Sequence, residues 1–186
     1  MDTQWPLYEV FEQESPGQPH RNAGSVHAPD AEMALQNARD VFVRRPDCAS
    51  LWVVPAGQVL SCTVEQLAGQ PAALALASGE PVETYEVFHK HTHRQSETYV
   101  THLGRVEAAS PLQALGLAQA RFLEQAALVW WVVPARAITA SQPADVESWF
   151  APARDRPYRQ PGFYHVLTQM RAIKASGQPG DPGEAA

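Results

Sequence analysis

The feature that most constrains this chain of 186 residues is an internal repeat. The string Tyr8–Phe11 recurs as Tyr85–Phe88, and Trp52–Ala56 recurs unchanged as Trp131–Ala135. Between these strings further positions match in the same order: Gly24 with Gly104, Ala34 and Leu35 with Ala114 and Leu115, and Phe42 with Phe122. Because the order of the matching positions is kept, the chain is predicted to contain two related units.

Each unit is predicted to fold as strand, strand, helix and strand. The YEVF strings begin the first strands, and the β-branched runs LWVV and WWVV form the third strands, each ended by proline. Apolar residues at helical spacing predict helices at about Ala31–Arg45 and Pro111–Ala126, with Asp30 and Ser110 as N-caps. A single unit buries little surface, whereas two units cover each other. The predicted fold class is therefore α+β, with tandem duplicated β-β-α-β units forming a pseudo-symmetric pair.

The two units leave three segments to be assigned. The predicted divisions are a first unit at 5–60, a linker at 61–82, a second unit at 83–140, an extended docking tail at 141–167 and a disordered tail at 175–186. A short helix is expected within Val64–Ala77 of the linker. The docking tail is rich in proline and aromatic residues and lacks a helical or strand period, so its aromatic side chains must dock on this chain or on a partner.

Composition narrows the range of functions. The net charge is −6 with no basic block, which argues against nucleic-acid binding. No apolar run approaches the roughly 18 residues that a membrane span needs. The first ten residues lack a signal-peptide layout, so we expect a cytoplasmic location. Cys48 and Cys62 form no CxxC pattern and are interpreted as small buried or incidental thiols, with a catalytic cysteine as the lesser alternative.

The stretch HKHTH places His89, His91 and His93 at alternate positions, which on a strand lie on one face and could hold a metal ion. The repeat aligns His89 with Glu12 and places the stretch where the first strand of the second unit ends. We therefore predict a solvated hairpin end, with a metal-dependent enzyme as an alternative. No catalytic, cofactor-binding or metal-binding residue is predicted, since GxSxG, P-loop and GxGxxG motifs are absent.

The remaining polar and aromatic residues are given structural interpretations. Glu9 and Glu86 are expected to be surface or interface groups on strands, and His20 and His27 to lie on an exposed strand face, although they could flank a pocket. The aromatic residues expected in the core are Trp5, Tyr8, Trp52 and Trp131, with an interface edge as the lesser alternative for Trp5 and Tyr8.

Longer strings support a family resemblance. WPLYEVF (Trp5–Phe11), the stretch His20–Arg45 and SLWVVPA (Ser50–Ala56) resemble the small B subunit of phenylacetyl-CoA ring 1,2-epoxidases, the PaaB family. The tail strings Phe150–Ala153 and Pro157–Tyr164 resemble the C-terminal end of that family. The resemblance is carried mainly by the first copy and the tail, and extends to the second copy through the internal repeat.

The resemblance implies a role in bacterial aerobic phenylacetate breakdown. It implies a non-catalytic connector or coupling subunit without a cofactor in a multicomponent oxygenase. The partners implied are a large di-iron catalytic subunit and its related structural subunit, with the flavin and iron–sulfur reductase as a further candidate contact. The alternative is a free-standing ligand-binding or regulatory module with its ligand between the two copies.

This chain departs from the family pattern of one unit followed by one tail. The tail expected after the first copy is replaced by the linker, and the second copy lacks the NARD and RR residues of the first. We interpret this as duplication and fusion, so that one chain replaces a homodimer. The residues predicted at the partner interface are Arg39, Arg44, Arg45, Trp149, Phe150, Tyr158, Arg159, Phe163 and Tyr164. For the arginines a solvated helix face, and for the tail aromatics packing on this chain itself, remain open alternatives.

Overall fold

The computed structural model describes residues 4–43, 48–68, 81–93, 99–151 and 166–176. The first unit comprises β1 (Leu7–Gln13), β2 (Arg21–His27), α1 (Ala31–Phe42) and β3 (Ser50–Pro55). The second unit comprises β5 (Glu83–Lys90), β6 (Thr101–Ala108), α3 (Pro111–Arg121) and β7 (Val129–Pro134). The chain thus combines helices with an antiparallel sheet, and both units follow the predicted order of elements.

All described strands belong to one sheet with the order β4-β7-β5-β6-β2-β1-β3-β8. The strand β4 (Leu60–Thr63) follows the first unit in the chain but pairs with β7 of the second unit. The strand β8 (Thr139–Ala140) follows the second unit but pairs with β3 of the first. Each unit therefore supplies the edge strand of the other unit. The two units cannot separate without breaking the hydrogen bonds between β4 and β7 and between β3 and β8.

The exchanged strands lead into short helices that fill the other unit's core. After β4 comes α2 (Val64–Ala68), and after β8 come η4 (Pro143–Asp145) and α4 (Val146–Phe150). The single turns η1 (Ala56–Gln58) and η3 (Ala135–Ala137) stand before β4 and β8. Leu67 of α2 belongs to the apolar core under α3, and Phe150 of α4 belongs to the core under α1. The described start of the predicted linker, residues 61–68, is therefore part of the fold. The tail also begins with helical turns that sequence periodicity did not indicate, because burial of a few side chains stabilises helices too short to show a period.

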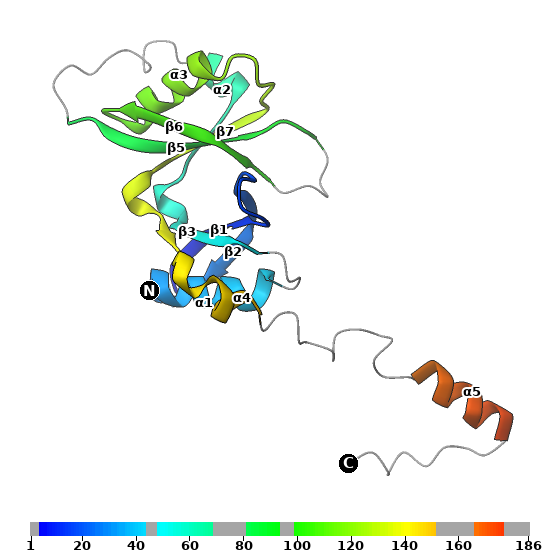
Figure 1. The fold of residues 1–186 in the computed structure, drawn as a ribbon. Coiled ribbons are helices and arrows are strands. Elements are labelled where there is room, and N and C mark those ends of the chain that lie inside the picture. Colours follow the sequence, from blue (N-terminus) through cyan, green and yellow to red (C-terminus); the bar gives the residue numbers. More distant parts are fainter. Residues whose placement is uncertain (1–3, 44–47, 69–80, 94–98, 152–165, 177–186) are drawn as a thin grey trace.

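The sheet consists of two halves, β4-β7-β5-β6 and β2-β1-β3-β8, which we call the half-sheets. The two half-sheets face each other, with α1 and α3 on the outer faces (Figure 1). Apolar residues accordingly form one cluster beneath each helix and a third cluster between the half-sheets. The matching residues Phe11 and Phe88 meet in this third cluster with ring centroids 4.4 Å apart, and both are fully buried. Complete burial of a phenylalanine side chain contributes on the order of 2–3 kcal/mol, so this contact is a main source of cohesion between the units.

Sequence rules located the helix starts better than the ends. Asp30 Oδ1 accepts a hydrogen bond from the Met33 amide at 2.8 Å, and Ser110 Oγ accepts one from the Gln113 amide at 3.2 Å, as predicted for N-caps. The helix α3 ends at Arg121, five residues before the predicted end. Helix ends lack a comparably strong side-chain signal in this chain, because no glycine directly follows either helix.

The predicted aromatic core is confirmed except at the start of β1. Tyr8 and Trp131 are buried and Trp52 is partly buried against the cluster between the half-sheets. Trp5 is 59% exposed, so its assignment to the core is wrong. Trp5 lies just before β1. Its carbonyl oxygen accepts a hydrogen bond from Nδ1 of His27 at 2.8 Å.

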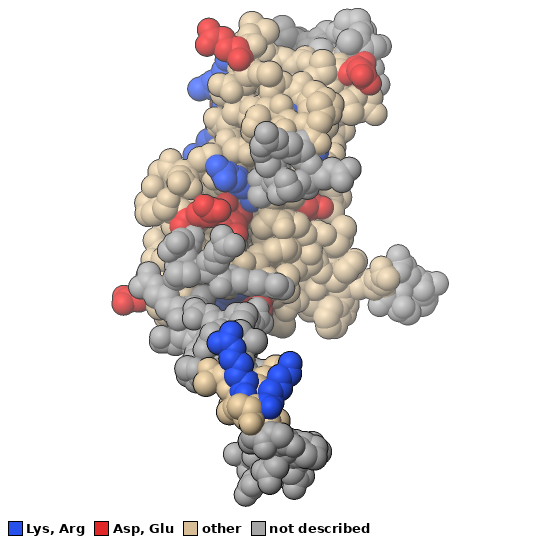
Figure 2. Space-filling view, turned by 90° about the vertical axis from the view of Figure 1, so that its right-hand side faces the viewer, with Lys and Arg blue, Asp and Glu red and all other residues tan. Residues whose placement is uncertain are grey.

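The last described element, α5 (Val166–Ser176), stands apart from the two units in Figure 1. In Figure 2 its basic side chains project at the lower end of the molecule. The helix extends to residue 176, so it overlaps the tail predicted to be disordered from residue 175. Within the described ranges, no helix has the length and hydropathy to cross a membrane.

Glycine marks the same irregularity in both units. Gly24 pairs with Val10 and has φ +138°, and Gly104 pairs with Val87 and has φ +151°. In each unit the strand register shifts at the next pair, so one extra residue forms a bulge. A Cβ on Gly24 would lie 2.9 Å from the ring of Phe42, which occupies the space that a side chain would need. Glycine is required here by both backbone angle and packing.

We predict that Gly24→Ala lowers the free energy of unfolding by about 2–3 kcal/mol, since it combines a strained φ with an aromatic clash. The matched control is Gly57→Ala, because a Cβ on Gly57 meets nothing within 4 Å and its φ is not positive. Urea unfolding followed by circular dichroism measures both. Equal stability of the two variants would show that the bulge does not need glycine.

Candidate functional site

The most polar region of the interior lies where β2 of the first unit meets β6 of the second. The amide of Asn22 donates to the Val100 carbonyl at 2.9 Å, and the amide of His102 donates to the His20 carbonyl at 2.8 Å. Arg21 and Thr101 are paired between these bonds. In the repeat Asn22 aligns with His102 and His20 aligns with Val100. The two bonds are therefore equivalent under the pseudo-symmetry that relates the two units.

A group of side chains gathers around these bonds, and we call it the seam cluster: His20, Trp52, Glu86, His102 and Arg105. His20 and Trp52 come from the first unit, and the other three come from β5 and β6 of the second. The ring of Trp52 stacks on His20 with centroids 3.6 Å apart and meets His102 edge-on at 5.5 Å. The cluster therefore spans both units.

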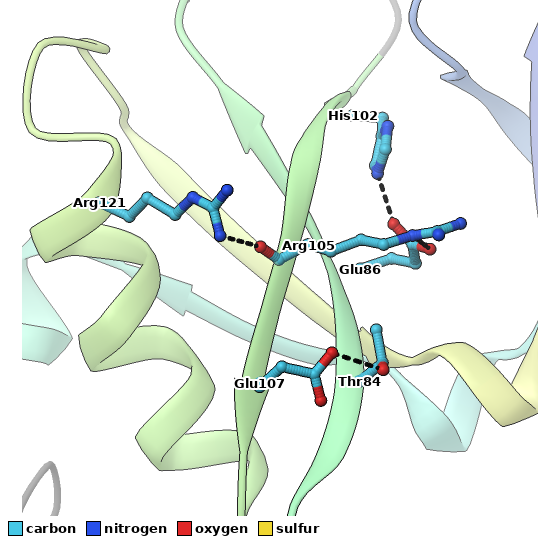
Figure 3. Close-up of polar contacts among 6 residues, drawn as sticks. All are labelled: Thr84, Glu86, His102, Arg105, Glu107 and Arg121. Carbon is cyan, nitrogen blue, oxygen red and sulfur yellow. Dashed lines mark hydrogen bonds and ion pairs between the residues drawn. The ribbon is translucent and has the colours of Figure 1, made fainter.

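Glu86 is the most buried charged residue of the seam cluster, with 1% of its surface exposed. Its Oε2 accepts a hydrogen bond from His102 Nε2 at 2.7 Å, and its Oε1 accepts one from Arg105 Nε at 2.5 Å (Figure 3). Arg121 of α3 donates to the Arg105 carbonyl at 2.9 Å, which ties the strand to the helix. Both oxygens of Glu86 thus have partners, as a buried carboxylate requires.

The pKa of Glu86 reflects opposing effects. Desolvation by burial raises it, whereas the hydrogen bonds and charges of His102 and Arg105 lower it, and the net effect places the pKa below its ordinary value. Glu86 is therefore a carboxylate at neutral pH. Its stabilising contribution is present above the unfolded-state pKa and is lost as the pH falls through the lowered folded-state pKa.

His20 is held neutral at physiological pH. Burial, followed by the nearby charge of His102, lowers its pKa to about 4, against a smaller opposing effect of Glu86. Its Nε2 shares a hydrogen bond with the hydroxyl of Ser50 at 3.1 Å. The prediction that His20 lies on an exposed face is wrong, since it is 6% exposed, whereas His27 is exposed as predicted.

The matching positions of the other unit carry different chemistry. Glu9 matches Glu86, but its Oε2 accepts a hydrogen bond from the side-chain amide of Asn22 at 2.9 Å. No arginine among the described residues donates a hydrogen bond to Glu9 as Arg105 does to Glu86. Burial raises the pKa of Glu9, and the Asn22 hydrogen bond only partly opposes this. Trp131 matches Trp52, but its Nε1 is buried without a hydrogen-bond partner. The polar network is therefore built on one side of the pseudo-symmetric pair.

This arrangement holds the two units in a defined relative orientation. Each oxygen of the Glu86 carboxylate accepts a hydrogen bond from one donor, and His20 is stacked and neutral. Burial, together with the neighbouring Glu12, raises the pKa of the Cys48 thiol to about 12, so this buried thiol stays protonated and is a poor nucleophile. The cluster does, however, require residues from both units, which specifies how they pair.

Two of the three histidines of HKHTH lie together, since the rings of His89 and His91 stack with centroids 5.4 Å apart. His89 lies in β5, is 6% exposed and is paired with Thr101 and Trp130, so its prediction as a solvated residue is wrong. Burial, then the charge of His91, lowers the pKa of His89, while a hydrogen bond to a backbone group raises it. His91 and His93 are exposed. Among the described residues no three His, Cys, Asp or Glu side chains are grouped to hold a metal ion.

Three of the residues predicted at a partner interface lie within the described ranges. Phe150 is 2% exposed in the core under α1, and Trp149 packs against the same cluster. Arg39 lies over the Trp149 ring, with its guanidinium carbon 5.5 Å from the centroid, and forms an ion pair with Asp40 at 3.1 Å. Trp149 and Phe150 therefore pack on this chain itself, which was the alternative to their prediction as partner-interface residues. The other predicted interface residues are outside the described ranges: Arg44, Arg45, Tyr158, Arg159, Phe163 and Tyr164.

Sequence reasoning missed the buried role of Glu86 and its partners. The repeat contains the pattern that could have shown this role. Alignment of the two copies matches His102 with Asn22 and Arg105 with Ser25. Two ionisable residues thus appear in the second copy beside a glutamate that both copies keep. That pattern predicts a hydrogen-bonded carboxylate better than an isolated surface acid.

Comparison with known proteins identifies the family. A family model described as "PaaB: Phenylacetic acid degradation B" matches residues 4–73 and 82–171. The chain belongs to the PaaB family. Each matched segment contains one of the two units, and the first includes β4 and α2, so the start of the predicted linker is part of the PaaB pattern. The resemblance inferred from the sequence is confirmed.

One relative within the PaaB family is the B subunit of 1,2-phenylacetyl-CoA epoxidase from Escherichia coli (strain K12). It is 48% identical over 62 residues, which are 33% of this chain. The chain spans 65% of the length of this curated relative. No solved structure matches the chain.

We predict that His20 makes this PaaB-family chain less stable as the pH falls from about 6.5 toward 4, by roughly 2–3 kcal/mol in total. Over this interval the unfolded histidine takes up a proton, whereas the buried His20 does not. Urea unfolding at several pH values should show that His20→Val, which introduces the residue found at the matching position 100, removes this loss.

The control is His27→Gln, which replaces an exposed histidine and shows what the loss of a histidine alone does to stability. If His20→Val and the unmodified chain lose stability in parallel between pH 6.5 and 5, the neutral, buried His20 is not the cause.

Proposed function

We propose that this chain is a non-catalytic connector or coupling subunit of a multicomponent oxygenase that epoxidises the ring of phenylacetyl-CoA. The observation that carries the proposal is the family match of both segments, together with a relative that is itself one subunit of such an epoxidase. The seam cluster supports it, since its polar groups bond to one another and bind the two units together.

The partners in this proposal are the large di-iron catalytic subunit and its structural partner subunit, with the reductase as a further contact. Iron chemistry then belongs to the large subunit, and this chain contributes surface and geometry. The proposed contact residues are the arginines Arg39, Arg44 and Arg45 and the tail residues Tyr158, Arg159, Phe163 and Tyr164. Trp149 anchors the root of the tail by packing against α1, which supports a fixed origin for that contact.

The proposal further assigns to one chain the place of a homodimer in the assembly. Two observations support it: the chain contains two family segments, and each unit completes the sheet of the other. A single chain of this kind offers one tail where two separate subunits would offer two. The proposed assembly therefore has half the number of tail contacts per pair of units.

A second candidate function is a ligand-binding module that works without large partners. A cavity of about 570 Å³ favours it, because it lies where the chain crosses from η1 into β4, next to the second unit. Its lining includes Glu83, Tyr85 and Arg136. Arg136 Nε donates to Glu83 Oε2 at 2.7 Å, so the charged groups of this cavity already have partners.

The test is co-expression with the catalytic and structural subunits from the same organism, followed by size exclusion with mass detection and metal analysis. Three forms are compared: the full chain, a chain ending at Ala151, and a full-length variant with Tyr158, Arg159, Phe163 and Tyr164 changed to alanine. Ending at Ala151 keeps Phe150 in its core, so loss of binding cannot be attributed to unfolding of the first unit.

The full chain is expected to co-elute with the large subunits, and iron to be found with them. The shortened and alanine forms are expected to bind at least tenfold more weakly, because aromatic and arginine side chains dominate most interfaces. Elution of the full chain alone, with a ligand-dependent rise in melting temperature, would instead favour the binding module.

A further inference from the structure

The helix α5 exposes its side chains to solvent along most of its length. It runs over 11 residues, and the side chains from Thr168 to Ala175 are all exposed. Met170 is 49% exposed and Ile173 is 45% exposed, and they stand three residues apart on one face. Isolated helices of this length are marginal in water, so α5 needs a surface to pack against.

The charges of the chain are segregated around this helix. Residues 152–176 contain five basic residues and one acidic residue, a net charge of +4. Residues 1–151 have a net charge of −8, and residues 177–186 add two acidic residues. Within α5 the charged residues are Arg171 and Lys174, with no acidic residue (Figure 2). Of these three parts of the chain, the one with a net positive charge is thus the helix α5 together with the residues just before it.

We propose that α5 docks with its Met170 and Ile173 face in an apolar groove that has an acidic rim, on another subunit of the assembly. This inference rests on the proposed function and adds to it a second contact, separate from the aromatic tail residues. Amphipathic helices commonly bind proteins by placing one apolar face in a groove. Arg171 and Lys174 would then meet carboxylates at the rim, which fixes direction and accelerates association.

Other surfaces fit α5 less well. A membrane-bound amphipathic helix usually carries large apolar or aromatic anchors and several basic residues, whereas α5 has no aromatic residue and two basic ones. Nucleic-acid binding is disfavoured by the net charge of −6 for the whole chain. The acidic first 151 residues could attract the helix electrostatically, but Figure 1 shows it away from both units.

The experiment uses full-length chains co-purified with the catalytic and structural subunits, with affinity measured at two salt concentrations. Met170→Asp combined with Ile173→Asp tests the apolar face. Arg171→Gln combined with Lys174→Gln tests the rim. The control, Thr168→Glu combined with Ala175→Glu, lowers the net charge by the same amount as the rim variant but places the change on the opposite face.

The apolar-face variant is expected to bind about a hundredfold more weakly, and the rim variant about tenfold more weakly with a smaller salt dependence. The control is expected to bind like the unmodified chain, and all four should melt alike because these side chains are exposed. If the complex forms and all variants bind equally, the inference fails while the proposed function stands. If the unmodified chain forms no complex, both fail.

Two further outcomes would overturn the inference in favour of another occupant. In one, the unmodified chain binds vesicles of phosphatidylglycerol and phosphatidylcholine, and the apolar-face variant does not. The other is a change in melting temperature of the apolar-face variant in the absence of any partner, which would show that α5 docks on its own chain.

Discussion

The contact on which the rest of the structure depends is the burial of the two half-sheets against each other, centred on Phe11 and Phe88. Each unit has a helix on one face of its sheet, so the opposite face would be exposed if the unit were alone. The third apolar cluster covers both of these faces at once. Neither unit has an independent way to bury that surface, which is why the repeat has to occur in pairs.

Exchange of the edge strands reinforces this contact. Because β4 completes the second unit and β8 completes the first, the segment that leaves each unit begins as a strand of the other unit's part of the sheet. Leu67 and Phe150 then extend the exchange into the two outer cores. The arrangement provides one chain with an interface like that between two subunits, and the family match of both segments fits this picture.

Because both units lie in one chain, their sequences can differ. In the second unit Glu86 has His102 and Arg105 as donors, whereas in the first unit the matching Glu9 has the amide of Asn22. A symmetric dimer would carry the same residues on both sides of its axis. Here the polar network is confined to one side, so the seam distinguishes the two units and specifies a single mode of pairing.

The sequence predicted the order of strands and helices well, because the repeat supplied each pattern twice and the caps Asp30 and Ser110 marked the helix starts. It did not predict the exchange of β4 and β8, since these strands are too short to show alternation and owe their place to tertiary pairing. It placed His20, His89 and Glu86 at the surface, because polarity alone does not reveal a buried hydrogen-bonded group. Trp5 was misplaced for the converse reason, as an apolar side chain at the start of a strand can remain exposed.

The most direct test of the central claim, that the two units form one body through exchanged strands, is to cut the chain between them. A specific protease site would be inserted between residues 69 and 80, and the cleaved protein examined by size exclusion with light scattering in native buffer. Both fragments should remain together in one particle with the mass of a single chain, about 20.4 kDa. Separation of the fragments under these conditions would contradict the claim.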